Sequence, residues 1–294
     1  MSPSGKRRLA EKIQGKTGTS QRRICKALKQ HRSVQRYRPK VNEEERRLIK
    51  AMHKLAVRYK RFGYRRITVE LKKQGWRVNA KRVHRLWKAE GLQLRKKRCK
   101  RKGTGNMGRN ACHINRAEYP NHVWSYDFVA ERTERGGRLR VLTVVDEFTR
   151  KCIAIKVCRK FRHLDLVDIL SELFVAHGKP MAIRSDNGSE FRAKVVEDML
   201  EAAGVKRLFV EPGSPWENGY IESFNGKLRD ECLNGELFLS LADARYVVEK
   251  WRRWYNDERP HSRLNWMTPS RFSASWVAPD SATPHPPPPT INVA

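Results

Sequence analysis

The order of apolar patterns between residues 122 and 256 constrains the fold of this chain more than any other feature. Three runs of strand-like alternation come first, two helical patterns then alternate with two further strands, and two helices follow. Neighbouring strands joined by short turns pair antiparallel, whereas helical crossovers join parallel strands. The pattern predicts an α/β domain with a five-stranded mixed sheet and flanking helices. The predicted strands cover 122–133, 138–146, 151–158, 181–188 and 205–212, and the predicted helices cover 163–180, 190–204, 219–234 and 241–256.

The residues before this domain predict helices. The first 40 residues mix Lys and Arg with Gly, Ser and Pro, which indicates a basic arm with one short helix at 20–28. A longer helix is predicted from Asn42, an N-cap residue followed by three glutamates that suit the positive end of the helix dipole. We expect this helix to end near Gly63.

Residues 64 to 92 have the spacing of a helix-turn-helix. A helix over 65–74 is broken by Gly75, and a second helix begins after Asn79 and stops at Gly91. An ordinary solvated basic face is the alternative interpretation of the second helix, but the basic run RKKRCKRK that follows favours contact with DNA. The side chains that this helix would turn outward are Lys81, Arg82, Arg85 and Lys88.

Charge is unevenly distributed along the chain. Residues 1–120 hold 38 of the 63 Lys and Arg residues but 7 of the 31 Asp and Glu residues, so nearly all of the net charge of +32 lies there. Such a block usually remains solvated or binds a polyanion, and nucleic acid is the commonest polyanion. A membrane is the weaker candidate, because no apolar run approaches the roughly 20 residues that span a bilayer and no signal segment opens the chain. We therefore expect a cytoplasmic protein.

The predicted organisation has five segments. They are a basic N-terminal arm (1–40), a helix-turn-helix DNA-binding domain (41–94), a basic linker (95–118), the α/β domain (119–272) and a disordered Pro-rich tail (273–294). The six cysteines are scattered and read as reduced thiols. Cys99, Cys112 and His113 lack a fourth ligand at a suitable spacing, which disfavours a zinc site.

Three carboxylates fall where chemistry is expected. Asp127 lies inside a strand, where a buried charge is costly unless something neutralises it. Asp186 closes the fourth predicted strand, at the sheet edge where α/β proteins bind ligands. Glu222 lies on a helix after 35 intervening residues. Each acid alone has an ordinary explanation as a satisfied core, turn or surface residue, but together they predict a catalytic site.

Such a set of acids suits phosphodiester exchange. Two cations about 3.5 to 4 Å apart activate the attacking hydroxyl and stabilise the leaving oxygen when carboxylates hold them. Hard oxygen ligands select Mg²⁺, with Mn²⁺ as a substitute. The predicted cofactor is therefore a pair of Mg²⁺ ions.

Several phrases together resemble one family, the OrfB-type transposases of bacterial insertion-sequence family three, within the integrase and transposase superfamily that is defined by two Asp and one Glu. The resemblance covers residues 20 to 271, and the upstream segment 64–92 resembles the helix-turn-helix of these proteins. Each phrase alone is weak evidence, but five in the right order are strong. The phrases are VWSYDF (123–128), TVVDEFTR (143–150), SDNGSEF (185–191), ENGYIESFNGKLRDE (217–231) and YNDERPHSRLNWMTP (255–269).

The resemblance implies an RNase H-like integrase catalytic core behind a helix-turn-helix region. It carries over Asp127, Asp186 and Glu222 as catalytic metal ligands, and it implies DNA contacts by Asn225 and Arg229, which share a helical face with the glutamate. It further implies a homo-oligomer on double-stranded DNA, acting on element ends and target near the bacterial nucleoid. A product of an upstream reading frame is implied as a further partner.

Two alternatives remain open at this point. The chain could be a non-catalytic DNA-binding regulator, or a partial transposase subunit that needs its upstream partner. It could also be an RNase H-like nuclease, because the fold does not determine the reaction. Four further acids are left out of the predicted site: Asp146 and Glu147 as structural residues, and Asp230 and Glu231 as surface residues.

Overall fold

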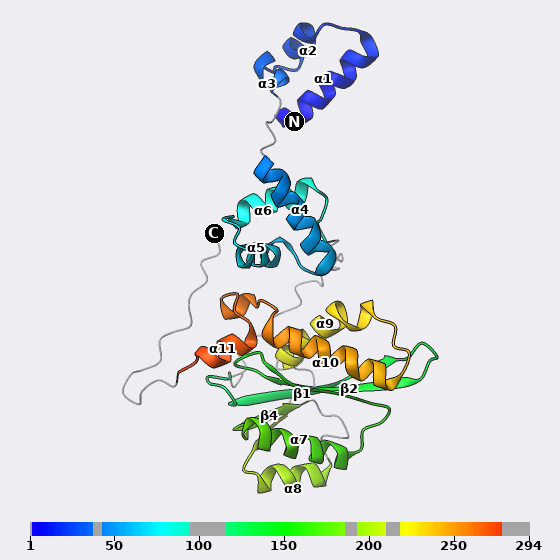
Figure 1. The fold of residues 1–294 in the computed structure, drawn as a ribbon, viewed down its shortest axis with the longest axis vertical. Helices are drawn as coiled ribbons and strands as arrows, with labels where there is room; N and C mark the ends of the chain where they lie inside the picture. The colour runs from blue at the N-terminus through cyan, green and yellow to red at the C-terminus, as the bar shows by residue number, and fades with distance from the viewer. Residues whose placement is uncertain (1, 38–42, 95–115, 186–192, 210–217, 278–294) are drawn as a thin grey trace, which may run out of the picture. The chain divides into compact units, whose positions relative to one another are not determined.

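The computed structural model describes residues 2–37, 43–94, 116–185, 193–209 and 218–277 (Figure 1). The chain divides into two compact units, Met1–Leu55 and Ala56–Ala294. Most of the predicted basic linker, the position of Asp186 and most of the predicted tail lie outside the described residues. The boundaries of the five predicted segments stay a prediction.

Three helices form the N-terminal part of the first unit, where the sequence predicted a basic arm with one short helix. Helix α1 spans Pro3–Thr17, α2 spans Gln21–Ala27 and α3 spans Arg32–Arg36, and each contacts the other two. The sequence missed α1 because few of its residues are apolar. The Ser2 side chain caps α1, with Pro following at the first helical position.

Helix α4 (Glu43–Arg58) begins with three glutamates, as predicted, whereas the predicted cap at residue 42 is not described. It ends at Arg58 rather than near Gly63, because the chain turns after it and the Phe62 N–H donates to the Tyr59 carbonyl oxygen at 3.0 Å. The rings of Tyr59 and Phe62 stack there with centroids 4.7 Å apart.

The predicted helix-turn-helix pair is confirmed. Helix α5 spans Tyr64–Lys73 and α6 spans Ala80–Ala89, and the two helices pack against each other. The Asn79 side chain accepts a hydrogen bond from the Arg82 N–H at 2.7 Å, so it caps α6 as the sequence predicted.

The five strands form one mixed sheet, which confirms the predicted fold class. The order is β3-β2-β1-β4-β5; β1, β2 and β3 pair antiparallel, and β4 pairs parallel with both β1 and β5. Gly136, with a φ of 76°, makes the tight turn between β1 and β2. The strands are β1 (Val123–Arg132), β2 (Arg138–Asp146), β3 (Cys152–Cys158), β4 (Ala182–Ser185) and β5 (Lys206–Phe209).

Helices cover both faces of the sheet (Figure 1). Helices α9 and α10 lie on one face and α7 and α8 on the other, with a separate apolar core under each pair. Side chains alternate along a strand, so Val129 of β1 joins the α9–α10 core, whereas Trp124 and Tyr126 join the α7–α8 core. The helices are α7 (His163–His177), α8 (Lys194–Ala202), α9 (Gly219–Glu231) and α10 (Leu241–Asp257).

The end of the described chain is partly helical. Two short 3₁₀ helices, η2 (Leu233–Gly235) and η3 (Ser262–Leu264), follow α9 and α10. Helix α11 spans Pro269–Ser275, so the prediction of a disordered tail from residue 273 is wrong for its first residues. Thr268 caps α11, and its Oγ1 accepts from the Arg271 N–H at 3.3 Å.

Candidate functional site

The carboxylate of Asp127 lies in the middle of β1, as predicted, and is half-buried. By alternation along the strand it shares the sheet face of Val129, which packs towards α9 and α10. Its Oδ1 accepts a hydrogen bond from the Phe128 N–H at 2.7 Å, and its Oδ2 accepts from Asn225 Nδ2 at 2.8 Å. Both donors are neutral amides, which orient a carboxylate without neutralising it.

Asn225 links α9 to β1 through its hydrogen bond to Asp127. Its side chain is buried, with 6% of the residue exposed, and its Oδ1 accepts a hydrogen bond from Thr143 Oγ1 at 3.0 Å. Thr143 of β2 is fully buried and lies opposite Asp127 in the strand register. The amide of Asn225 is thus engaged within the protein at both ends, and the DNA contact predicted for it stays a prediction.

Glu222 lies in the first turn of α9 and is exposed. Asn225 follows it three positions later, so the two lie on one helical face, with a rise of about 4.5 Å between them. Ile221, Phe224 and Leu228 hold α9 in place, because they are buried in the core between α9 and strands β1 and β2. The structure thus brings the helix of Glu222 against the strand of Asp127.

The position of Asp186 lies outside the described residues, directly after Ser185, where β4 ends. Strand β4 pairs parallel with β1, so its carboxyl end points in the same direction along the sheet as that of β1. Among the described residues no three His, Cys, Asp or Glu side chains gather as a metal site. A three-carboxylate site would need Asp186.

Asp146, which was not among the predicted site residues, accepts hydrogen bonds that hold a turn in place. Its Oδ1 accepts from the Phe148 N–H at 2.8 Å and the Thr149 N–H at 3.3 Å, and its Oδ2 accepts from the Asn121 N–H at 3.0 Å. Burial raises the pKa of Asp146, and these hydrogen bonds oppose the rise. The carboxylate stabilises the turn between β2 and β3.

Glu147 is also structural, and its side chain is fully buried. Its Oε1 accepts from Arg184 Nε of β4 at 2.9 Å and from the hydroxyl of Ser125 on β1. Its Oε2 has no hydrogen-bond partner within the part of the chain that the structure describes. Burial raises the pKa of Glu147, and Arg184 and Ser125 oppose the rise.

The side chain of Glu231 is only 8% exposed, so the interpretation of it as a surface acid is wrong. Its two oxygens accept from Arg259 Nε and Nη2, each at 2.6 Å, and Arg259 is itself fully buried. Arg259 Nη1 lies 3.3 Å from His261 Nε2. Burial and the Arg259 charge lower the pKa of His261 to about 2, so this imidazole stays neutral. Asp230 remains half-exposed, as predicted.

Two cationic side chains of α9 follow the glutamate. Arg229, predicted to contact DNA, is exposed in the last turn. Lys227, which was not among the predicted site residues, donates from Nζ to the Ser223 carbonyl oxygen at 2.8 Å and to the Ser223 hydroxyl at 2.6 Å. Burial and then the charge of Arg259 lower the pKa of Lys227 to about 8.

The basic residues predicted on α6 point away from its buried face. Val83, Leu86 and Trp87 are buried. Three of the four predicted DNA-binding residues, Lys81, Arg85 and Lys88, are exposed, and Arg82 is half-exposed.

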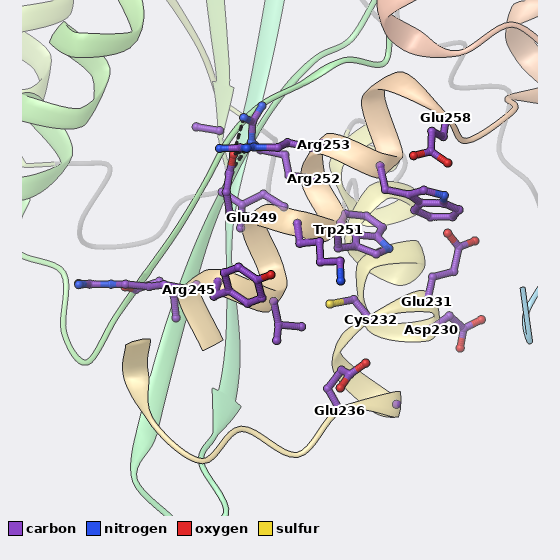
Figure 2. A pocket seen from close by; sticks show the side chains of 18 of the residues that line it. Asp230, Glu231, Cys232, Glu236, Arg245, Glu249, Trp251, Arg252, Arg253 and Glu258 are labelled. Atoms are coloured by element: carbon purple, nitrogen blue, oxygen red, sulfur yellow. Dashed lines mark hydrogen bonds and ion pairs between the residues drawn. The ribbon is translucent and has the colours of Figure 1, made fainter. Parts of the chain in front are cut away.

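A wide groove lies apart from the predicted catalytic residues (Figure 2). Residues of α10, of β3 and of the segment after α9 line it, and neither Asp127 nor Glu222 does. On its wall Glu249 accepts from Arg252 Nε at 2.8 Å and from Arg253 Nε at 3.0 Å. Hydrogen bonding by Arg252 lowers the pKa of Glu249. This groove is not the predicted active site.

Comparisons with known proteins agree with this architecture. Two integrase core domain families match residues 117–215 and 203–269, and an HTH-like domain family matches residues 40–102. The fold is similar to that of a chain in a solved structure, the cryo-EM structure of the simian T-cell lymphotropic virus intasome in complex with PP2A regulatory subunit B56 gamma. The TM-score is 0.52 at 16% sequence identity, and the match covers 81% of this chain and 79% of the other. Fold and family together define a DNA-cutting polynucleotidyl transferase of the integrase class.

Proteins of similar sequence show which family within this class the chain belongs to. The chain is 40% identical over 262 residues to the uncharacterized 31.7 kDa protein of insertion element IS407 from Burkholderia multivorans. The aligned region covers 89% of this chain and 93% of that relative. It is 28% identical to the transposase for insertion sequence element IS904 from Lactococcus lactis, over 72% of this chain and 87% of the relative. The chain belongs to the OrfB-type transposases of insertion-sequence family three, and it is an insertion-sequence transposase.

These findings favour the transposase over the regulator and the nuclease that the sequence left open. They also make DNA the partner on which the chain acts. No helix among the described residues is long and apolar enough to cross a membrane.

Proposed function

We propose that Asp127, Asp186 and Glu222 hold two Mg²⁺ ions, with which this transposase hydrolyses element 3′ ends and joins them to target DNA. The observation that carries the proposal is the 2.8 Å hydrogen bond from Asn225 Nδ2 to Asp127 Oδ2. It ties β1 to α9 one helical turn from Glu222, so the first and third predicted ligands belong to neighbouring elements.

The donor set fits a hard divalent cation. Asp127 and Glu222 offer carboxylate oxygens, which Mg²⁺ prefers, and Mn²⁺ would substitute. The donors to Asp127 described above, the Phe128 N–H and Asn225 Nδ2, are both neutral. When bound, two such ions activate an attacking oxygen and stabilise a leaving one.

The exposed face of α6 and the last turn of α9 would bind DNA. Lys81, Arg85 and Lys88 extend into solvent from α6, and Arg229 does so from α9. Phosphate contacts of this kind set the position of the duplex rather than its sequence specificity. Within the cell, near the nucleoid, we propose a homo-oligomer on paired element ends, with an upstream-frame product as a further partner.

The test is a strand-transfer assay with a labelled element-end oligonucleotide and a plasmid target. We expect Asp127→Asn, Asp186→Asn and Glu222→Gln each to lose at least about 100-fold in cleavage and joining, while their DNA affinity in EDTA stays within threefold of the wild type. Asp168→Asn on α7 and Glu201→Gln on α8 are matched controls, because both acids are exposed and lie on the opposite face of the sheet from α9.

Full strand transfer by all three variants would refute the site. Cleavage of an RNA–DNA hybrid without joining would instead indicate a nuclease, and DNA binding without either reaction would indicate a regulator. A wild-type chain that joins DNA only after an upstream-frame product is added would define a subunit of a larger enzyme.

A further inference from the structure

We propose that Asn225 and Thr143 are positioning residues that fix the orientation of the Asp127 carboxylate for metal binding. The inference rests on the proposed function, because it assumes that Asp127 is a metal ligand. It gives Asn225 a task different from the DNA contact that the sequence predicted.

The strand register sets up the arrangement. Asp127 of β1 and Thr143 of β2 are direct cross-strand partners, so their side chains project from the same face of the sheet, towards α9. Thr143 Oγ1 lies 3.2 Å from the Asp127 backbone oxygen and 3.0 Å from Asn225 Oδ1. A carboxylate and a hydroxyl thus stand side by side opposite the helix.

The chemistry of the partners fixes which way the Asn225 amide points. An ionised carboxylate only accepts hydrogen bonds, so the amide nitrogen must face Asp127. The amide oxygen then faces Thr143, whose hydroxyl donates to it. If Thr143 lost its hydroxyl, the amide could turn over, and Asp127 Oδ2 would then lose the hydrogen bond from Asn225 Nδ2.

Two hydrogen bonds hold the carboxylate in one orientation. The Phe128 N–H at 2.7 Å fixes Oδ1, and Asn225 at 2.8 Å fixes Oδ2. Because Asn225 is buried, water cannot readily replace it as the donor. The same contact holds α9 against the sheet, and thereby holds Glu222 one turn away. Without the contact between Asn225 and Asp127, the carboxylates of Asp127 and Glu222 would both have to become ordered when the metal binds.

Partners that orient metal ligands typically contribute about 10- to 100-fold to metal affinity or activity. We therefore expect Asn225→Ala to weaken Mn²⁺ binding by about this factor. Thr143→Val, which keeps the shape of the side chain but removes the hydroxyl, should weaken it in the same direction. Thr143→Ser, which keeps the hydroxyl, should bind Mn²⁺ within threefold of the wild type.

The experiment uses the full chain and Mn²⁺ alone, with free ion followed by electron paramagnetic resonance. The Mg²⁺ concentration for half-maximal 3′-end cleavage is measured in parallel, as is DNA affinity in EDTA. The matched control is Asn256→Ala, since Asn256 is also buried and hydrogen-bonded at both amide ends, but to the backbone of Cys152. It should lose stability and leave the dissociation constant for Mn²⁺ unchanged.

The proposal is overturned if Asn225→Ala binds Mn²⁺ as tightly as the wild type, or if Asn256→Ala weakens binding equally. A loss of DNA affinity in Asn225→Ala with unchanged Mn²⁺ affinity would also overturn it, in favour of a DNA contact. The Asp127→Asn variant distinguishes failure of the proposed metal site from failure of the positioning role. If Asp127→Asn leaves Mn²⁺ binding intact, the proposed metal site itself fails. If it weakens binding and Asn225→Ala does not, only the positioning role fails.

Discussion

The buried pair of Glu147 and Arg184 joins the antiparallel and parallel halves of the sheet, and its removal should be costly. Arg184 lies on β4 and Glu147 directly follows β2, with side chains 5% and 0% exposed and an Nε–Oε1 distance of 2.9 Å. Arg184 also stands two residues before the predicted ligand Asp186. Arg184→Met would leave Glu147 with the Ser125 hydroxyl on Oε1 and no cationic partner from β4.

Removing one partner of a fully buried ion pair costs about 3 to 5 kcal/mol, because the other charge stays buried without compensation. We expect Arg184→Met to lower the free energy of unfolding by this amount at pH 7.5. Replacing both charges by apolar groups is often near neutral, so Arg184→Met/Glu147→Met should recover most of the loss. Urea unfolding followed by tryptophan fluorescence measures both variants.

The loss should depend on pH. Burial already raises the pKa of Glu147 above its ordinary value of 4.5, and Arg184 is one of the groups that lower it. Without Arg184 the pKa rises further, so the folded variant keeps a proton that the unfolded chain releases. The contribution of Glu147 to the stability of the variant is therefore greatest below pH 4.5 and falls as the pH rises through the folded-state pKa. The gap to the wild type should narrow between pH 7.5 and pH 5.

Two results would refute this reasoning. One is a loss below about 1 kcal/mol for Arg184→Met at pH 7.5, the size typical of an exposed pair. The other is a double variant no more stable than the single one. A gap that stays constant between pH 5 and pH 7.5 would show that the loss comes from packing rather than from the charge of Glu147.

Three further predictions concern other parts of the chain. Lys81→Ala and Arg85→Ala should each reduce the slope of log affinity against log salt for DNA by about 1, as measured by fluorescence anisotropy; an unchanged slope would remove that residue from the interface. Asn256→Ala should lower the free energy of unfolding by about 1 to 3 kcal/mol, because the buried Cys152 N–H loses its Asn256 acceptor, whereas the Cys152 carbonyl oxygen keeps Arg252 Nη1 at 3.3 Å; an unchanged free energy of unfolding would contradict this. With the two cysteines outside the described residues replaced by serine, a thiol reagent should modify the half-exposed Cys158 in the folded protein and the three buried thiols only after urea is added; equal rates for all four would be inconsistent with the structure.

Much of the architecture could be predicted because local patterns carry it. Alternating apolar residues predicted β1 to β3, helical periods predicted α7 to α10, and the cap at Asn79 fixed the start of α6. The failures occurred where local signals are weak. Helix α1 is mostly polar, and α4 ends at Arg58 because a turn follows it, without a Gly or Pro at its last residue.

The candidate site also has a part that could be predicted from the sequence and a part that could not. Asp127, Asp186 and Glu222 stand out by residue type, spacing and motif, which are properties of the chain itself. The surroundings of these acids depend on contacts distant in sequence: Thr143 lies opposite Asp127 only in one strand register, and Asn225 reaches Asp127 across 98 residues. Glu231 looks like any surface acid until Arg259, 28 residues later, pairs with it in the core.

The sequence by itself therefore determined most of the elements that form and the family to which the chain belongs, and it predicted the three acids that are proposed to hold the metal. Those properties follow from periodicity, composition and motifs, and each is encoded within a short stretch. Only the tertiary structure decided that Asn225 faces Asp127, that Glu147 and Glu231 are buried with arginines, and that Thr143 completes the contact. A hydrogen bond between distant residues depends on strand register and helix rotation, which are settled only when the whole core packs.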